Sequence, residues 1–500
     1  MRKFVLQCVF MACAVAPACA FADPDPALWL DRITWGANAA SWQALQAQGM
    51  PAFLQQQLDP HAPDALPPEV QARIDAMDIS RRPTVDLVRD LDRQRRDAEG
   101  AGDPERKKAA RKAFKQAAEA LAREAATRHV LRAIYSPAQL REQMTWFWLN
   151  HFNVYSRKHA LGALVADYED RAIRPHALGR FRDLLGATLH HPAMLLYLDN
   201  ARNAAGQINE NYARELMELH TLGVDGGYTQ RDVQELARVL TGVGVLPLER
   251  EKAARAHAVQ VDGLFAYYPR RHDNGDKRIL GVTIKGRGYP EVEEVLDMLA
   301  RHPATARNLS RQLAQYFVSD TPSPALVDAM AQTYLRTDGD IAAVLATMFA
   351  TPEFNASLGH KFKDPMHYVV SAARQGYDGR VIMNADPLLK AVQRLGESLY
   401  EHQTPDGYAL DMAAWASPGQ MTARFDIAQA MGGPMPALLQ ADDASAAAPR
   451  KESMPSLNTA FFQTAIAPRL SANTRAALAG AHTPKEWNGI WLAAPEFMMR

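Results

Sequence analysis

The sequence predicts a mainly α-helical protein, a multi-helical globular domain with a small β-hairpin excursion around residues 265–290. Two observations predict the helices. Residues 41–60 carry apolar side chains at helical spacing, broken only at Gly49-Met50-Pro51. From Thr84 to Tyr135 the chain is rich in Ala, Arg, Lys and Glu and is interrupted once, at "EGAGDPE". This composition predicts two long helices.

A third observation predicts the hairpin. Between Pro269 and Pro290 the chain reads "PRRHDNGDKRILGVTIKGRGYP", where Asn274-Gly275 is a tight-turn signal. The β-branched residues that follow suit short strands beside turns, namely Ile279, Val282 and Ile284. Helices are expected to resume at Glu291. The small, polar, proline-containing stretch 440–456 predicts a mobile surface loop.

The first 22 residues have the pattern of a cleaved signal peptide. Arg2 and Lys3 precede an apolar stretch from Phe4 to Val15. Ala18-Cys19-Ala20 fits a cleavage site, and so does Ala20-Phe21-Ala22 directly after it, which would leave Asp23 as the first residue. Lipid modification of Cys19 is an alternative, although the residues before it form a poor lipobox. We therefore expect a periplasmic or secreted protein whose single helical domain spans residues 23–500.

The composition excludes several classes of function. All three cysteines lie in residues 1–22, so the mature chain has no disulfide, thiolate nucleophile or cysteine metal ligand. Without Arg2 and Lys3 the chain has 54 basic and 56 acidic residues, a charge of −2, which argues against nucleic acid as a partner. No apolar run after the signal approaches the roughly 20 residues of a transmembrane segment.

The densest group of charged residues lies in "NENYARELMELHTLGVDGGYTQRDV", residues 209–233. We expect a helix from Asn209 to Thr221, with Asn209 as its N-cap. Helical periodicity places His220 on the apolar face and Glu218 on the opposite, polar face, so the two cannot readily bind one metal ion. Thr229 and Asp232 predict a capping box at the start of the next helix.

The polar face of this helix allows two interpretations. Glu215 and Glu218, three residues apart, form a pair of repelling carboxylates, which is how an acid/base pair is prepared. In that case Asn211 and Arg214 would bind or orient substrate. The alternative is an exposed ladder of ion pairs from Glu210 through Arg214 to Glu218, with no catalytic role.

Two further segments carry candidate ligand-binding residues. In "REQMTWFWLNHFNV", Trp146, Trp148, Asn150 and His151 could line a cleft as an aromatic platform with polar groups. The alternative is a helix buried nearly all round. In "RRHDNGDK", His272 and Asp273 could reach across to the central helix. The alternative there is an ordinary turn.

Six blocks of the sequence occur in this order in one bacterial family: "LDRITWGANAASWQALQAQGMPAFLQQQL", "REQMTWFWLNHFNV", "HPAMLLYLDN", "NENYARELMELHTLGVDGGYTQRDVQELARVLTG", "RRHDNGDKRILG" and "WLAAPEFMMR". From about Leu28 to the C-terminus, the chain resembles the DUF1800 family of large exported bacterial proteins of uncharacterised function. The resemblance supports export and domain extent, but no reaction. Gly407-Tyr408 stands where the family pattern implies a Gly-Trp pair in a proline-rich segment. If that segment lines a site, substrate preference here would differ.

The favoured hypothesis is an exported enzyme that acts on cell-envelope or extracellular glycan, as a hydrolase or lyase, with Glu218 as the acid and Glu215 as the second carboxylate. One alternative is a non-catalytic envelope protein that binds or assembles a polysaccharide or another exported protein. A second is a metal or haem protein using His151, His220 or His272. No motif identifies a cofactor, and no metal ligand set is predicted.

Overall fold

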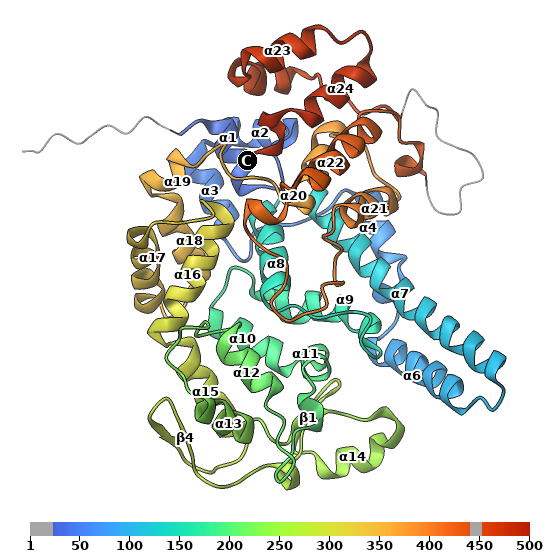
Figure 1. The fold of residues 1–500 in the computed structure, drawn as a ribbon, viewed down its shortest axis with the longest axis vertical. Helices are drawn as coiled ribbons and strands as arrows, with labels where there is room; N and C mark the ends of the chain where they lie inside the picture. The colour runs from blue at the N-terminus through green and yellow to red at the C-terminus, as the bar shows by residue number, and fades with distance from the viewer. Residues whose placement is uncertain (1–23, 441–452) are drawn as a thin grey trace, which may run out of the picture.

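The computed structural model describes residues 24–440 and 453–500, so the predicted signal peptide and most of the predicted loop at 440–456 lie outside the described residues. The prediction of a mainly α-helical protein with small antiparallel hairpins is confirmed (Figure 1). The chain begins with five helices: α1 (Pro26–Ile33), α2 (Ala39–Gln48), α3 (Met50–Leu58), α4 (Pro68–Asp75) and α5 (Asp78–Arg81).

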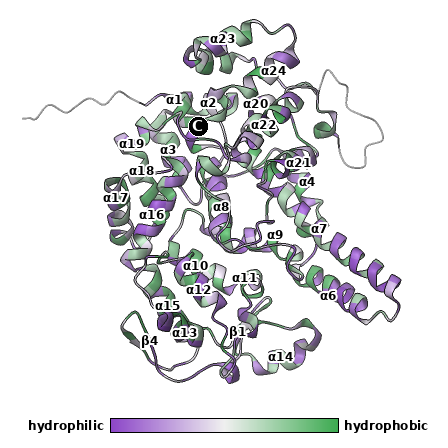
Figure 2. Cartoon of the chain, viewed as in Figure 1, coloured by the Kyte–Doolittle hydropathy of each residue, from purple (hydrophilic) through white to green (hydrophobic). Residues whose placement is uncertain are grey.

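The two long helices predicted between Thr84 and Tyr135 are α6 (Thr84–Gly100) and α7 (Pro104–Tyr135). They form an antiparallel hairpin that projects from the body of the molecule (Figure 1). Asp103 caps α7 by accepting a hydrogen bond from the backbone N–H of Arg106, at 2.9 Å. The outer part of the hairpin is hydrophilic (Figure 2), whereas the last turns of α7 are buried.

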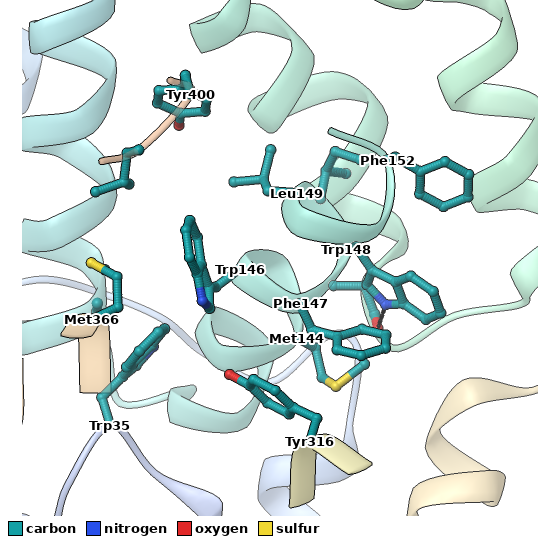
Figure 3. Packing of buried hydrophobic residues seen from close by; sticks show 14 of the residues in the cluster. Trp35, Met144, Trp146, Phe147, Trp148, Leu149, Phe152, Tyr316, Met366 and Tyr400 are labelled. Carbon is teal, nitrogen blue, oxygen red and sulfur yellow. Dashed lines mark hydrogen bonds between the residues drawn. The ribbon is translucent and has the colours of Figure 1, made fainter. Parts of the chain in front are cut away.

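Helix α8 (Gln139–His151) runs through the core, and every one of its residues is buried. Trp146 leaves one side of the helix while Phe147, Trp148 and Phe152 leave others, so apolar contacts surround it (Figure 3). The indole N–H of Trp148 donates to the carbonyl of Ala177 at 3.0 Å, which satisfies its polar atom inside the core. This is the arrangement that a helix buried nearly all round requires.

The middle of the chain consists of short helices, most of which lie below α8 in the view of Figure 1. These are α9 (Val165–Asp167), α10 (Phe181–His190), α11 (Pro192–Tyr197), α12 (Asn211–Glu218), α13 (Gln230–Val239) and α14 (Glu251–His257). Short 3₁₀ and π turns link the helices throughout the chain: η1 (Leu161–Ala163), η2 (Tyr168–Ile173), η3 (Arg174–His176), η4 (Asn200–Arg202), η5 (Leu248–Arg250), η6 (Pro269–Arg271), η7 (Met412–Ala414), η8 (Pro436–Leu439), η9 (Phe462–Ile466) and η10 (Ala467–Arg469).

Strands form two small antiparallel sheets. Strand β3 (Phe265–Tyr267) pairs with β1 (Val243–Val245) and β2 (Gln260–Asp262), and β4 (Lys277–Ile279) pairs with β5 (Val282–Ile284). The predicted hairpin is therefore present, and its turn is Leu280-Gly281, with φ of 50° and 81°. Gly275 donates its N–H to the Asp273 carboxylate at 2.9 Å, in a turn that precedes the hairpin.

The second half of the chain is helical again. It contains α15 (Pro290–Ala300), α16 (Pro303–Phe317), α17 (Pro324–Arg336), α18 (Ile341–Phe349), α19 (Pro352–Ala356), α20 (Pro365–Gly376), α21 (Asp386–Arg394), α22 (Pro418–Met431), α23 (Ala472–Ala479), α24 (Pro484–Ala493) and α25 (Pro495–Met498). The end of the described chain returns to α1 and pairs with the segment before α20 through Phe362 and Met499 (Figure 1).

Candidate functional site

Helix α12, which carries Glu215 and Glu218, is shorter than predicted. It spans Asn211–Glu218 with Glu210 at its N-cap position, and Asn209 instead accepts a hydrogen bond from the N–H of Asn211 at 2.9 Å. Its last backbone bonds converge on the carbonyl of Glu215, after which Gly223 adopts a φ of +85° that reverses the chain. The predicted capping box of Thr229 and Asp232 at the start of α13 is confirmed.

The polar face of α12 holds only part of the predicted ladder. Arg214 pairs with Glu210 at 3.2 Å and donates to the side chain of Gln230 at 2.8 Å. Glu218 accepts from the hydroxyl of Tyr228 at 3.4 Å and forms no ion pair with Arg214 in the described part of the chain. Asn211 donates to the carbonyl of Leu198 at 3.2 Å. Glu218 is therefore left available on its open side.

A cavity of about 330 Å³ opens beside Glu218. Four segments that are far apart in sequence form its walls: the end of α8, the end of α12 with the following turn, one face of α16, and residues 406–411. The lining residues are Phe147, Asn150, His151, Glu218, Leu219, Gly223, Val224, Asn308, Arg311, Gln312, Gln315, Asp320, Asp406, Gly407, Tyr408, Ala409, Leu410 and Asp411. We refer to this cavity as the cleft.

Three of the predicted site residues line the cleft: Asn150, His151 and Glu218. Asn150 uses both ends of its side-chain amide on one residue, accepting from the N–H of Tyr408 at 2.6 Å and donating to its carbonyl at 2.8 Å. A side chain at Gly407 would place its Cβ 2.3 Å from the backbone oxygen of Asn150. Asn150 therefore holds the 406–411 wall in place, and glycine is needed at 407 for that approach.

His151 connects α8 to two other walls. Its Nδ1 lies 2.9 Å from the Oε1 of Gln312, and its Nε2 lies 3.2 Å from the carbonyl oxygen of His220. Both partners are acceptors, so a neutral imidazole can donate to only one of them at a time. Burial lowers the pKa of His151, which favours the neutral form.

The two carboxylates of α12 occupy different positions. Glu218 lines the cleft, whereas Glu215, half-buried one turn earlier, does not. Burial raises the pKa of Glu215, and the charges of Glu218 and Asp406 raise it further against the opposing effect of Arg214. The predicted repulsion between the two carboxylates is thus part of the site, with Asp406 as a third contributor.

The structure places the predicted aromatic residues behind the cleft. Trp148 is fully buried in the core. Trp146 is 5% exposed, and its ring lies 6.4 Å from that of Tyr408, nearly parallel to it. Trp146 therefore supports a cleft residue from the inside, while Phe147 and Tyr408 are the aromatic side chains that line the cleft.

His272 and Asp273 belong to a separate cluster, in which His272 is buried and Asp273 is partly exposed. His272 contacts Glu291 through Nε2 at 3.2 Å and the carbonyl of Thr241 through Nδ1 at 2.8 Å. Asp273 pairs with Arg238 at 2.8 Å, which lowers the pKa of Asp273 to about 2. These contacts fasten the turn before β4 to α13 and α15, and neither residue lines the cleft.

His220, the third histidine considered, lies in the core. Its ring nitrogens have no hydrogen-bond partner among the described residues, and its ring centroid is 6.0 Å from that of His151. Burial holds the pKa of His220 well below its ordinary value. Within residues 24–440 and 453–500, no group of three or more His, Cys, Asp or Glu side chains is arranged to hold a metal ion.

Sequence reasoning missed the cleft residues of α16 as well as most of the 406–411 wall. Asn308, Arg311, Gln312 and Gln315 recur at three- and four-residue spacing on one helical face, a polar stripe that the sequence does display. Arg311 donates to Asn308 at 2.9 Å and has no carboxylate within 4.0 Å in the described part of the chain. What the stripe faces depends on tertiary packing, which periodicity does not give.

Comparison with known proteins gives a family. Residues 28–499 match the family described as "Protein of unknown function (DUF1800)". No curated protein and no solved structure matches the chain. None of the helices in the described ranges combines the length and the apolar character that crossing a membrane would require.

Proposed function

The chain belongs to the DUF1800 family, and from the chemistry of its cleft we propose that it is an exported enzyme that cleaves a glycan of the cell envelope or extracellular space. The observation that carries the proposal is the position of Glu218, a carboxylate free of any Lys or Arg partner in the described chain, on the wall of a polar cleft. Its neighbour Glu215 supplies the second carboxylate.

The lining of the cleft suits a polyhydroxylated ligand. The amides of Asn308, Gln312 and Gln315 line the cleft as a polar face held in place by hydrogen bonds within the protein, and Asp406 adds a carboxylate. The ring of Tyr408 can pack against the apolar face of a pyranose. Val224, which lines the cleft and is 70% exposed, adds an apolar contact that is open to solvent. Few apolar side chains and many hydrogen-bonding groups favour a sugar over a hydrophobic substrate.

The proposed reaction uses the two carboxylates as a pair. Burial and the charge of Glu218 raise the pKa of Glu215, so Glu215 retains a proton at higher pH than an isolated glutamate would. Glu218, which reaches the cleft, donates a proton to the glycosidic oxygen as the bond to the anomeric carbon breaks. Water then adds to that carbon and replaces the transferred proton. Asp406 lies in the cleft to stabilise positive charge that develops on the sugar ring.

The test is the release of reducing ends from envelope polysaccharides incubated with the mature chain. Glu218→Gln is expected to lower the rate by at least about 100-fold while the variant remains folded. Glu210→Gln is the matched control, because Glu210 pairs with Arg214 and does not line the cleft. Equal rates for wild type and Glu218→Gln would refute the acid role.

A second candidate is glycan binding without cleavage, and the position of Glu215 outside the cleft lining favours it. In that case Glu218→Gln would leave polysaccharide retention by the protein nearly unchanged, and wild type would release no reducing ends. Arg311→Ala, which removes a lining cation, would weaken retention under either candidate. Export is tested separately by fractionation and by the N-terminal sequence of the mature protein, expected to begin at Asp23.

A further inference from the structure

A second cavity, of about 240 Å³, lies on another side of the molecule and shares no lining residue with the cleft. Helix α1, the turn before α20, the η9–η10 segment and the helices α24 and α25 surround it. Its apolar lining residues are Ala27, Leu28, Ala37, Leu358, Phe461, Ile466, Leu470, Trp491, Phe497 and Met499. An apolar cavity of roughly 150 Å³ is enough to bind benzene, so this one can hold a larger hydrocarbon group.

Most polar groups of the lining already have protein partners. Gln375 accepts from the indole N–H of Trp491 at 3.1 Å. Glu496 accepts from the N–H of Ser471 and the hydroxyl of Thr474, both at 2.8 Å. The hydrogen-bonding capacity of these groups is therefore used within the protein, and a molecule in the cavity would contact mainly hydrocarbon.

Lys363 is the buried exception. It is 2% exposed, and Asp31 Oδ2 at 3.3 Å is the sole ion-pair or hydrogen-bond partner of its ammonium in the chain as described. An ammonium has three N–H donors, and a charge-assisted hydrogen bond is usually about 2.7–2.9 Å long. Nζ also lies 4.5 Å from the ring centroid of Phe497, another lining residue. At least two donors of a buried cation are thus left to be satisfied, which is costly without a further acceptor.

The surroundings of Lys363 favour an anion as that acceptor. Burial lowers the pKa of Lys363, and the nearby guanidinium groups of Arg500 and Arg424 lower it further. Asp31 opposes them, but it also accepts the N–H of Ala37 at 3.0 Å. A negative charge placed on Lys363 would offset the repulsion among these cations.

We propose that this cavity binds an aliphatic monocarboxylate, the chemical class of the medium-chain fatty acids. The hydrocarbon chain lies against Leu28, Leu470 and Trp491, and the carboxylate accepts hydrogen bonds from the ammonium of Lys363. The site is independent of the glycan cleft, since the two share no residue. Binding of the carboxylate at this site involves no chemical reaction.

The test is isothermal titration of the mature chain with decanoate and decanol, each below its micelle-forming concentration. Decanoate is expected to bind with one-to-one stoichiometry, and decanol at least about tenfold more weakly, because it lacks a charge to pair with Lys363. Absence of decanoate binding, or equal affinity for decanol, would overturn the proposal. A short apolar peptide also ends in a carboxylate, and binding of such a peptide more tightly than decanoate would overturn the proposal as well.

Two variants locate the binding. Lys363→Gln is expected to raise the dissociation constant of decanoate at least about tenfold and leave that of decanol nearly unchanged. Leu28→Trp, at a half-buried lining position, is expected to weaken both by filling the cavity, and it serves if Lys363→Gln does not fold. Lys112→Gln, at an exposed position of α7, is the matched charge control. If decanoate binds both cavity variants as tightly as wild type, decanoate binds elsewhere on the protein and the proposed site is refuted.

Discussion

Glu215 and Glu218 are three residues apart on one short helix, yet their surroundings differ. Glu218 meets the open cleft and the hydroxyl of Tyr228, while Glu215 is half-buried between the charges of Glu218 and Asp406. Helical periodicity was sufficient to predict that the two carboxylates repel each other. The contribution of Asp406 could not be predicted, because nearly 190 intervening residues (Glu218 to Asp406) must fold before the two meet.

The raised pKa of Glu215 leads to a prediction about stability and pH. A carboxyl whose pKa is higher in the folded than in the unfolded state favours folding while it is protonated. That contribution is complete below the unfolded value of 4.5 and is lost as pH rises through the higher folded value. Glu215→Gln, which stays neutral, should therefore unfold at a higher urea concentration than wild type at pH 7, and the difference should shrink at pH 4.

The expected gain at pH 7 is less than about 1 kcal/mol, because solvent screens a half-exposed group. Urea unfolding followed by circular dichroism at the two pH values measures it. Glu210→Gln is the control, since Glu210 has a cationic partner, Arg214, and should lose rather than gain stability. A Glu215→Gln variant less stable than wild type at pH 7 would contradict the assignment.

At the scale of elements, some local signals were reliable and others were not. The break between α6 and α7 and the capping box of α13 follow from residues within a few positions of each other, and both are confirmed. Asn274-Gly275 signals a turn and lies in one, but the turn of the β4–β5 hairpin is Leu280-Gly281, where Leu280 adopts a left-handed conformation that the sequence does not signal. The sheet of β1, β2 and β3 joins strands separated by α14, a pairing that pattern alone does not reveal.

The β4–β5 hairpin depends on one buried ion pair. Lys277 in β4 and Glu291 in α15 have fully buried side chains and lie 2.5 Å apart, with His272 also contacting Glu291. Lys277→Met removes the cation and leaves a buried carboxylate without it, which should cost about 3–5 kcal/mol of unfolding free energy. Urea unfolding at pH 7 measures this loss.

Two variants test that explanation of the loss. The double variant Lys277→Met, Glu291→Leu removes both charges and should recover much of the lost stability. Lys285 pairs with Asp276 at 2.6 Å, and its side chain is 69% exposed. Lys285→Met should therefore change stability by less than about 1 kcal/mol. A double variant as unstable as Lys277→Met alone would indicate that the cost is not that of an unpaired carboxylate.

At the scale of the whole molecule, segments that are far apart in sequence meet at shared sites. The cleft is one such site, since α8, α12, α16 and residues 406–411 each supply part of its wall. The predicted residues that reached it, Asn150, His151 and Glu218, lie at the ends of helices, where chain segments meet. Two of those that did not, Trp146 and Trp148, are large apolar side chains, for which burial in the core is the stronger driving force.

Arg32 likewise joins segments that are far apart in sequence. Its guanidinium is fully buried and donates to the hydroxyl and the carbonyl of Ser357, at 2.8 and 2.6 Å, and also contacts the carbonyl oxygens of Phe317 and Arg500. It thus joins α1, α16, the turn after α19 and the end of the described chain. Arg32→Met would leave three buried carbonyl oxygens without this donor, and we expect a loss of about 3–5 kcal/mol in unfolding free energy.

Because Arg32 connects segments from both ends of the described chain, its loss should also reduce cooperativity. Urea unfolding followed by tryptophan fluorescence and by circular dichroism should give coincident transitions for wild type and separate ones for Arg32→Met. Arg301→Met is the control, since Arg301 pairs with Asp338 with its side chain 61% exposed, and should change stability by less than about 1 kcal/mol. If Arg32→Met unfolds in one transition at the wild-type midpoint, these contacts do not hold the segments together.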